Sequence, residues 1–181
     1  YSKQYPFVDV PITNPNSPWQ DAGPLYVNGP RMHEFLSEMN EILSKYDTMT
    51  VGELGLTPDI NKVLKYVSAA EKQLNMVFMF DAVALGLGPR KYDTTPFNYK
   101  LTDLKRAIAA QQQLSTGTDA WSTTFMENHD QPRSISRFAT EDPAYRIQAG
   151  KMLAILSATL SGTLYLFQGQ EIGMTNMPKD W

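Results

Sequence analysis

The chain has 181 residues, a formal net charge of −3 and no cysteine. This length suffices for one domain with a buried core, because a domain of ~150 residues buries roughly 70% of the surface that its unfolded chain exposes. The acidic balance provides no basic surface for phosphate groups, so we expect no nucleic-acid partner. Without cysteine the chain can form neither disulfides nor thiolate metal sites, which fits a cytoplasmic location.

Proline content and hydrophobic periodicity predict the elements of the first half of the chain. Residues 1–30 carry six prolines and predict an irregular loop region. Apolar residues at three- and four-residue spacing then predict an amphipathic helix over residues 32–43, with Pro30 in its first turn. Residues 48–53 are rich in β-formers and predict a strand buried on both faces. Asp59 is a candidate cap for a second helix over residues 60–67, and a second apolar strand is expected over residues 76–80.

The second half of the chain continues the same alternation. Thr102 is a candidate cap for a third helix that extends to Leu114 and leads into a strand over residues 122–126. A fourth helix is expected from about Pro143, followed at Gly162 by a strand over residues 163–167. Its expected buried residues are Ala149, Met152, Leu153, Leu156 and Leu160. Serine, threonine and glycine interrupt the apolar stretch over residues 152–167, so we expect no membrane-spanning segment.

Four predicted strands thus alternate with four helices, and the strands are continuous apolar runs. This pattern predicts an α/β fold with a parallel sheet, either a (β/α) barrel or a doubly wound sheet. A complete eight-stranded barrel takes roughly 250 residues. The sequence therefore predicts half of a barrel, incomplete as given, with about four β/α units over residues 31–181.

Two carboxylates stand where predicted strands end. Glu53 ends the first strand, and Asp130 ends the polar run that follows the third strand. The carboxyl ends of parallel strands in a barrel lie on one rim, so we expect both side chains to share a site. Two carboxyl groups on one rim could act together in acid/base chemistry.

The neighbours of Asp130 are candidates for binding or support. His129 is expected to contact the same ligand as Asp130, although a structural hydrogen bond is the commoner role of a lone histidine. Glu127 lies further back on the strand, so we expect it to be buried and hydrogen-bonded and to support the site, with a catalytic role as the weaker alternative. Asn128 is expected to support the site as well. Arg133 could bind a ligand hydroxyl or form a salt bridge with a loop carboxylate, and both alternatives stay open.

Residues 125–133, Phe-Met-Glu-Asn-His-Asp-Gln-Pro-Arg, resemble the fourth signature segment of the α-amylase superfamily of retaining glycosidases. The likeness is to the branch of α-glucosidases, maltases and oligo-1,6-glucosidases. Residues 49–54 resemble the third signature segment, and residues 167–173 resemble a segment at the end of the last barrel strand. The resemblance spans essentially the whole chain and implies the C-terminal half of a TIM-type (β/α)8 catalytic barrel.

The resemblance also implies roles for residues. Glu53 matches the general acid/base, Asp130 the stabiliser of the transition state, and His129 an imidazole that contacts the same sugar ring, while Glu171 is expected to be structural. The implied substrate is a short oligosaccharide with a terminal α-linked glucose, and no metal or other cofactor is implied. Asp9 does not match the family's nucleophile, because Phe7 occupies the place of the arginine in Gly-Phe-Arg-x-Asp. The nucleophile is therefore expected upstream of this chain.

Other functions within the superfamily stay open. A non-catalytic partner subunit of a membrane transporter need not keep the acid/base or the stabiliser, so Glu53, His129 and Asp130 favour an enzyme. A sucrose isomerase or glucosyl transferase uses the same carboxylates as a hydrolase. The preference for α-1,4 or α-1,6 linkages and the oligomeric state are not predicted by these residues.

Overall fold

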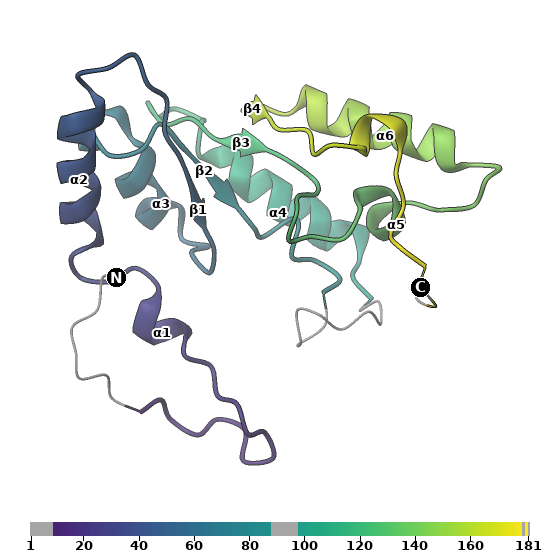
Figure 1. The fold of residues 1–181 in the computed structure, drawn as a ribbon, viewed down its shortest axis with the longest axis horizontal. Helices are drawn as coiled ribbons and strands as arrows, with labels where there is room; N and C mark the ends of the chain where they lie inside the picture. Colours follow the sequence, from purple (N-terminus) through teal and green to yellow (C-terminus); the bar gives the residue numbers. More distant parts are fainter. Residues whose placement is uncertain (1–8, 88–97, 179, 181) are drawn as a thin grey trace.

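The computed structural model describes residues 9–87, 98–178 and 180 of the chain. Its strands are short and alternate with helices, so the α/β class is confirmed (Figure 1). The strands are β1 (Val51–Leu54), β2 (Met76–Met79), β3 (Thr123–Thr124) and β4 (Thr163–Leu164). The helices are α1 (Gly23–Tyr26), α2 (Met32–Leu43), α3 (Ile60–Val67), α4 (Leu101–Gln113), α5 (Ser134–Phe138) and α6 (Arg146–Thr159), with 3-10 turns η1 (Ala69–Glu71) and η2 (Gln170–Ile172).

The strands form two parallel pairs, β1 with β2 and β3 with β4. The two pairs are adjacent, because the Thr123 hydroxyl donates a hydrogen bond of 3.0 Å to the Val77 carbonyl oxygen. The four strands therefore follow one another in chain order, from the α2 end of the molecule to the α6 end (Figure 1). They do not close into a barrel within the described residues.

The main core lies between the first strand pair and its helices. It consists of Val63, Tyr66, Val67, Val77, Met79, Leu114 and Ala120. Fully burying a side chain of this size contributes about 1.5–3 kcal/mol, so this cluster holds α3 and the segment after α4 against β2. The predicted cap of α3 is confirmed: the Asp59 carboxylate accepts a hydrogen bond of 3.0 Å from the Asn61 backbone N–H.

The first strand differs from its prediction. It begins at Val51 rather than at residue 48, and it is not buried on both faces, since Val51 is 38% exposed and Glu53 is exposed. The reason is its position, because within the described residues β1 pairs with β2 along one edge only. Strands β3 and β4 are likewise shorter than predicted, with two residues each.

The starts of three helices differ in detail from their predictions. Helix α2 starts at Met32 after Arg31, so Pro30 precedes the helix. Lys100 is the N-cap of helix α4, and Thr102 lies inside the helix. The Asp103 carboxylate accepts a hydrogen bond of 3.0 Å from the Lys100 backbone N–H. This bond provides a partner for a backbone N–H group at the start of the helix, the role that was expected of Thr102. Helix α6 begins at Arg146 instead of near residue 143.

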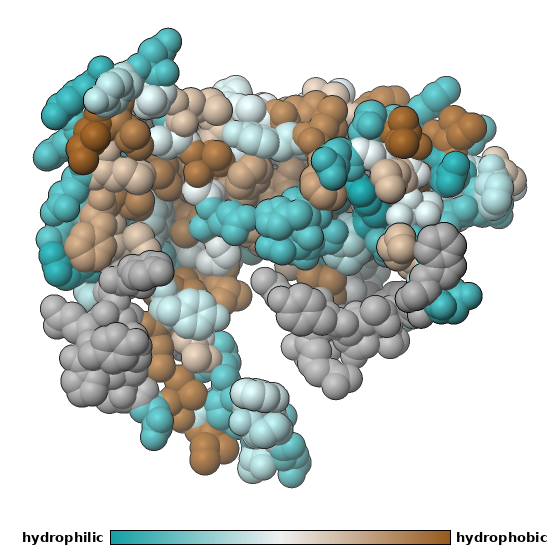
Figure 2. All heavy atoms as spheres, viewed as in Figure 1, coloured by the Kyte–Doolittle hydropathy of each residue, from teal (hydrophilic) through white to brown (hydrophobic). Residues whose placement is uncertain are grey.

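Helix α6 buries fewer residues than predicted. Leu153 is buried as expected, but Met152 is 53% exposed. Apolar side chains occur all round this helix, so their spacing does not single out one face. Hydrophobic residues accordingly gather on the surface at the α6 end of the molecule (Figure 2). The exposed ones on α6, on β4 and after β4 are Ile147, Met152, Ile155, Leu164, Leu166, Ile172, Met174 and Met177.

The N-terminal region agrees with the prediction of an irregular loop where it is described. Residues 9–22 contain no regular element, and α1 is a single turn. Residues 1–8 of the predicted loop lie outside the described residues. None of the helices in the described ranges is long and apolar enough to cross a membrane.

Candidate active site

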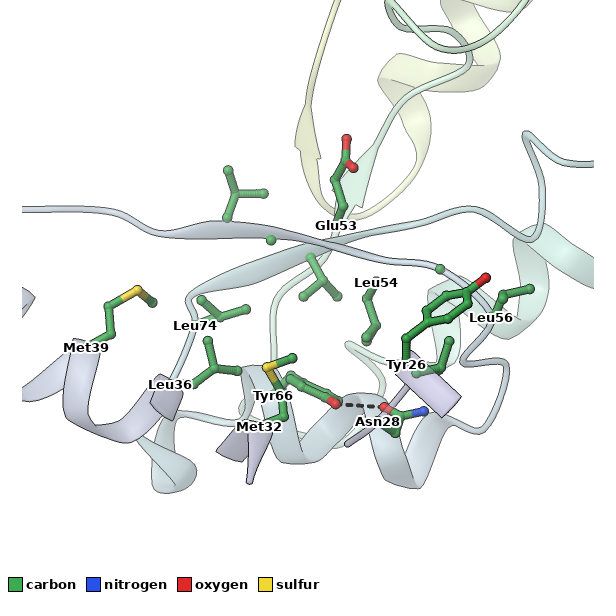
Figure 3. A pocket seen from close by; sticks show the side chains of 15 residues that line it. Tyr26, Asn28, Met32, Leu36, Met39, Glu53, Leu54, Leu56, Tyr66 and Leu74 are labelled. Carbon is green, nitrogen blue, oxygen red and sulfur yellow. Dashed lines mark hydrogen bonds between the residues drawn. The ribbon is translucent and has the colours of Figure 1, made fainter. Parts of the chain in front are cut away.

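Strand β1 places Glu53 on the face turned away from α2. Glu53 stands in register with Phe78 of β2, and its carboxylate points to the opposite side of β1 from Leu36 and Leu74 (Figure 3). The side chain is exposed. Register neighbours of parallel strands project to the same face of the sheet, so the ring of Phe78 lies beside Glu53.

Asp130 and His129 lie in the loop that follows β3. The Asn128 side-chain oxygen accepts a hydrogen bond of 2.8 Å from the Asp130 backbone N–H, which folds a local turn at this point. His129 Nε2 lies 3.4 Å from Asp130 Oδ2. The two side chains are 70% and 67% exposed, so both can meet a ligand from solvent.

The structure brings Glu53, His129 and Asp130 together. A carboxylate oxygen of Glu53, a ring nitrogen of His129 and a carboxylate oxygen of Asp130 all lie within 4.8 Å of one another. The prediction that both carboxylates share one rim is therefore confirmed in its geometry. Such a group offers oxygen acceptors and a nitrogen that can donate, which suits a ligand rich in hydroxyl groups.

The same three side chains could also reach one cation. All three are exposed, so a metal ion would find no enclosed set of ligands there, and exposed acidic groups commonly gather without one. That no metal takes part stays a prediction.

An aromatic cluster lies beside Glu53 on the same face of the strands. Phe78 contacts Phe125 edge to face at a centroid distance of 5.0 Å and Tyr165 at 4.7 Å. These rings come from β2 and from the segments next to β3 and β4, so they tie the two strand pairs together. They form an apolar floor beside Glu53.

Arg133 and Glu127 form a buried ion pair behind the exposed groups. Arg133 Nη1 lies 2.8 Å from Glu127 Oε1, and the two side chains are 16% and 1% exposed. The second oxygen of Glu127 accepts a hydrogen bond of 2.5 Å from the Ser134 backbone N–H. The prediction of a buried, hydrogen-bonded Glu127 is confirmed. For Arg133 the salt-bridge alternative is present in the structure, and a contact with substrate stays a prediction.

Glu171 and Asp9 lie away from this group. The Glu171 carboxylate accepts a hydrogen bond of 2.8 Å from the Gly169 backbone N–H, at a turn where Gly169 has a positive φ of 87°. This placement agrees with the structural role predicted for Glu171. Asp9 is an exposed residue of the N-terminal loop.

Comparison with known proteins identifies the family. Residues 6–181 match the model of the α-amylase catalytic domain. The chain belongs to the α-amylase family. It is 51% identical over 182 residues to an α-glucosidase of Candida albicans and 43% identical over 186 residues to an oligo-1,6-glucosidase of Saccharomyces cerevisiae. Each match covers 100% of this chain and 31% of the relative, so this α-amylase family chain spans about a third of their length.

A solved structure of the family agrees with the fold. The trehalose-6-phosphate hydrolase of Bacillus licheniformis superposes with a TM-score of 0.76 at 38% sequence identity. The likeness covers 88% of this chain and 28% of that enzyme. The resemblance to the α-glucosidase and oligo-1,6-glucosidase branch, first drawn from the signature segments, is confirmed by these relatives.

The sequence did not predict the contacts that hold the loop after Glu53 in this α-amylase family chain. The Tyr66 hydroxyl donates a hydrogen bond of 2.7 Å to the side-chain oxygen of Asn28, whose amide nitrogen donates one of 3.0 Å to the Thr57 hydroxyl. The Thr57 hydroxyl in turn donates to the Gly55 carbonyl oxygen at 3.2 Å. Burial raises the pKa of Tyr66, which keeps its phenol a neutral donor.

Asn28 adopts a left-handed backbone conformation with a φ of 50°. The Asn-Gly-Pro sequence at this point is a turn signal that could have indicated it, but the partners lie too far along the chain to be inferred.

A cavity beside β1 includes Glu53 in its lining, but it opens mainly on the other side of the strand. It measures about 530 Å³ and lies between β1 and the helices, where Met32, Leu36 and Met39 of α2 line it (Figure 3). The carboxylate of Glu53 points away from these side chains. The cavity therefore lies at the helix–strand interface, and the Glu53 carboxylate lies on the opposite face of β1.

Proposed function

We propose that the protein containing this chain is a retaining α-glucosidase that releases α-linked glucose from short maltose-type or isomaltose-type oligosaccharides. The observation that carries the proposal is the convergence of Glu53, His129 and Asp130 within 4.8 Å on one rim of parallel strands. The family membership and the names of the relatives support the same reaction.

In this mechanism Glu53 is the general acid/base. Its carboxylic acid protonates the glycosidic oxygen as the bond to the leaving group breaks, and the resulting carboxylate then removes a proton from the water that hydrolyses the glycosyl–enzyme intermediate. The intermediate forms on a second carboxylate, roughly 5–5.5 Å from that of Glu53, which we expect from a part of the enzyme outside this chain.

Asp130 and His129 bind the sugar ring in the proposed mechanism. The Asp130 carboxylate accepts hydrogen bonds from ring hydroxyls, and these bonds strengthen as positive charge develops on the ring in the transition state. His129 donates a hydrogen bond to a hydroxyl of the same ring. The aromatic floor of Phe78, Phe125 and Tyr165 fixes the strands from which these groups project.

We further propose that the four parallel strands are the C-terminal half of a (β/α)8 barrel. The parallel pairing and the chain order of the strands support this, as does the coverage of about a third of each relative. A cytoplasmic location is proposed on the weaker ground that the sequence has no cysteine.

A segment exchange tests the function. Residues 1–181 replace the matching segment of the Candida albicans α-glucosidase, and we call the product the chimeric enzyme. We expect it to hydrolyse an aryl α-glucoside and to release glucose from maltose or isomaltose. Glucose as the main product from disaccharides separates hydrolysis from isomerisation, which would yield a rearranged disaccharide. A folded chimeric enzyme without activity would contradict the proposed function.

The variant Glu53→Gln tests the role of the acid. Protonation of the leaving oxygen matters least when that oxygen leaves easily, so the variant should lose hydrolysis of maltose while it partly keeps that of activated aryl glucosides. General acid catalysis contributes typically about 10²–10⁴-fold, which sets the expected loss on maltose. Glu38→Gln, at an exposed position on α2, is the control and should behave as wild type. An equal loss on both substrates would show that Glu53 is not the acid.

A further inference from the structure

The loop that presents His129 and Asp130 is closed at its base by a buried ion pair. Glu127 directly precedes the loop and Arg133 directly follows it, and their side chains meet at 2.8 Å. Both oxygens of the Glu127 carboxylate are in use, one for Arg133 and the other for the Ser134 backbone N–H. The loop between them is thus fixed at both ends by one carboxylate that is 1% exposed.

Arg133 also fixes the loop to the segment after β4. Its Nη1 donates a second hydrogen bond of 2.7 Å to the Gln168 carbonyl oxygen, and its guanidinium carbon lies 4.8 Å from the centre of the Phe167 ring. Its backbone N–H donates to the Asn176 side-chain oxygen at 2.8 Å. The guanidinium is therefore engaged by the chain itself, and its side chain is only 16% exposed.

We propose that Glu127 and Arg133 are positioning residues, an ion pair that sets where His129 and Asp130 meet the substrate while neither member of the pair touches it. The inference rests on the proposed function and extends it to how the loop is held. It differs from the substrate contact that the sequence alone allows for Arg133, because the contacts of the guanidinium face inward. Geometry of this kind is sensitive, since a misplacement of about 1 Å can cost on the order of 10²-fold in rate.

The test is a cycle of variants in the chimeric enzyme: Glu127→Gln, Arg133→Gln and the double variant. Glutamine at position 127 replaces one acceptor oxygen by a donor that faces another donor, so one of the two hydrogen bonds is lost. Glutamine at position 133 leaves the buried carboxylate without its cation, so this variant should have the lowest Tm. The double variant removes both charges and should recover part of that Tm.

Activity should not follow stability across this cycle. We expect kcat to fall by about tenfold to a hundredfold in all three variants with KM little changed, and the double variant to lose far less than the product of the two single losses. Arg133→Lys keeps the charge but not the planar fork, so it should recover part of the kcat lost in Arg133→Gln. Arg106→Gln is the matched control, because it breaks an exposed ion pair with Asp103 on α4 and should leave Tm and kcat as in wild type.

Any of several results would overturn the inference. One is a raised KM with unchanged kcat in Arg133→Gln while Glu127→Gln is silent, which would identify a direct substrate contact. The others are independent effects of the two substitutions on Tm, or a double variant with full kcat. Binding of a glucose-shaped iminosugar, measured by calorimetry, distinguishes failure of this inference from failure of the proposed function. An inactive wild-type chimeric enzyme would refute the proposed function. An iminosugar affinity that is unchanged across the variants would refute the positioning role.

Discussion

Asn28 offers the sharpest test of how the loop after Glu53 is held. Tyr66 and Thr57 are 4% and 3% exposed, and Asn28 supplies a hydrogen-bond partner to both of their hydroxyls. A buried hydroxyl that loses its partner costs about 1–3 kcal/mol. Thr57 keeps the Gly55 carbonyl oxygen as a partner, so the main cost of removing the Asn28 side chain falls on Tyr66.

The expected magnitudes follow from these contacts. Asn28→Gly keeps the left-handed backbone accessible and removes only the side chain, so we expect a local loss of about 2 kcal/mol. Asn28→Ala adds the cost of placing alanine at a φ of 50°, about 1 kcal/mol more. Tyr66→Phe removes one hydroxyl and should cost about 1 kcal/mol. The double variant Asn28→Gly/Tyr66→Phe leaves no orphaned phenol, so its cost should be below the sum of its parts.

Hydrogen exchange of the chimeric enzyme measures these local losses directly. Peptides that cover residues 51–58 should exchange about fivefold faster in Tyr66→Phe and about thirtyfold faster in Asn28→Gly, whereas peptides from α6 should be unchanged. Tyr46→Phe is the matched control, because Tyr46 is 66% exposed and its loss of a hydroxyl should not affect exchange. Additive effects in the double variant, or equal exchange in the glycine and alanine variants, would refute the reasoning.

A further prediction concerns the second strand pair, β3 and β4. At Gly162, which has a φ of 137°, a Cβ would lie 2.9 Å from the Ser122 carbonyl oxygen, so Gly162→Ala should cost about 1–3 kcal/mol and speed exchange at β4. Gly117→Ala is its control, since that position also has a positive φ but nothing within 4 Å, and an equal loss in both would contradict the steric part.

The hydrogen bond from Ser68 holds the pKa of Asp119 below its ordinary value, so the charged form stabilises the fold. The contribution of this charge to stability is fully present above the pKa of Asp119 in the unfolded chain, about 3.9. It is lost as the pH falls through the lower pKa of Asp119 in the folded protein. The Tm difference between wild type and Asp119→Asn should therefore shrink below about pH 4, and a constant difference would speak against it.

Several parts of the fold that depend on neighbouring residues were predictable from the sequence, although the local cap of α4 was not. The Asp59 cap acts on a backbone group two residues away, and the amphipathic spacing of α2 reflects one exposed and one packed face. The shared rim of Glu53 and Asp130 was predictable as well, because parallel strands place their carboxyl ends together.

The parts that depend on distant partners were not predictable. Asn28 contacts Thr57 and Tyr66, which lie 29 and 38 residues along the chain. Helix α5 was missed because its first residue follows Arg133, which makes no side-chain cap. The Glu127 carboxylate, seven residues upstream of Ser134, instead accepts a hydrogen bond from the Ser134 backbone N–H at the start of the helix.

The exposed side chains of the candidate site and the residues that support them are different residues. Glu53, His129 and Asp130 are exposed and make few contacts with the rest of the chain, so their replacement should cost little stability. Their supports are buried: the hydrogen bonds of Asn28 hold the segment after one strand, and the Glu127–Arg133 pair holds the loop after another. Because each support acts on the segment after a different strand, we expect that weakening either one moves Glu53 and Asp130 relative to each other without removing either side chain.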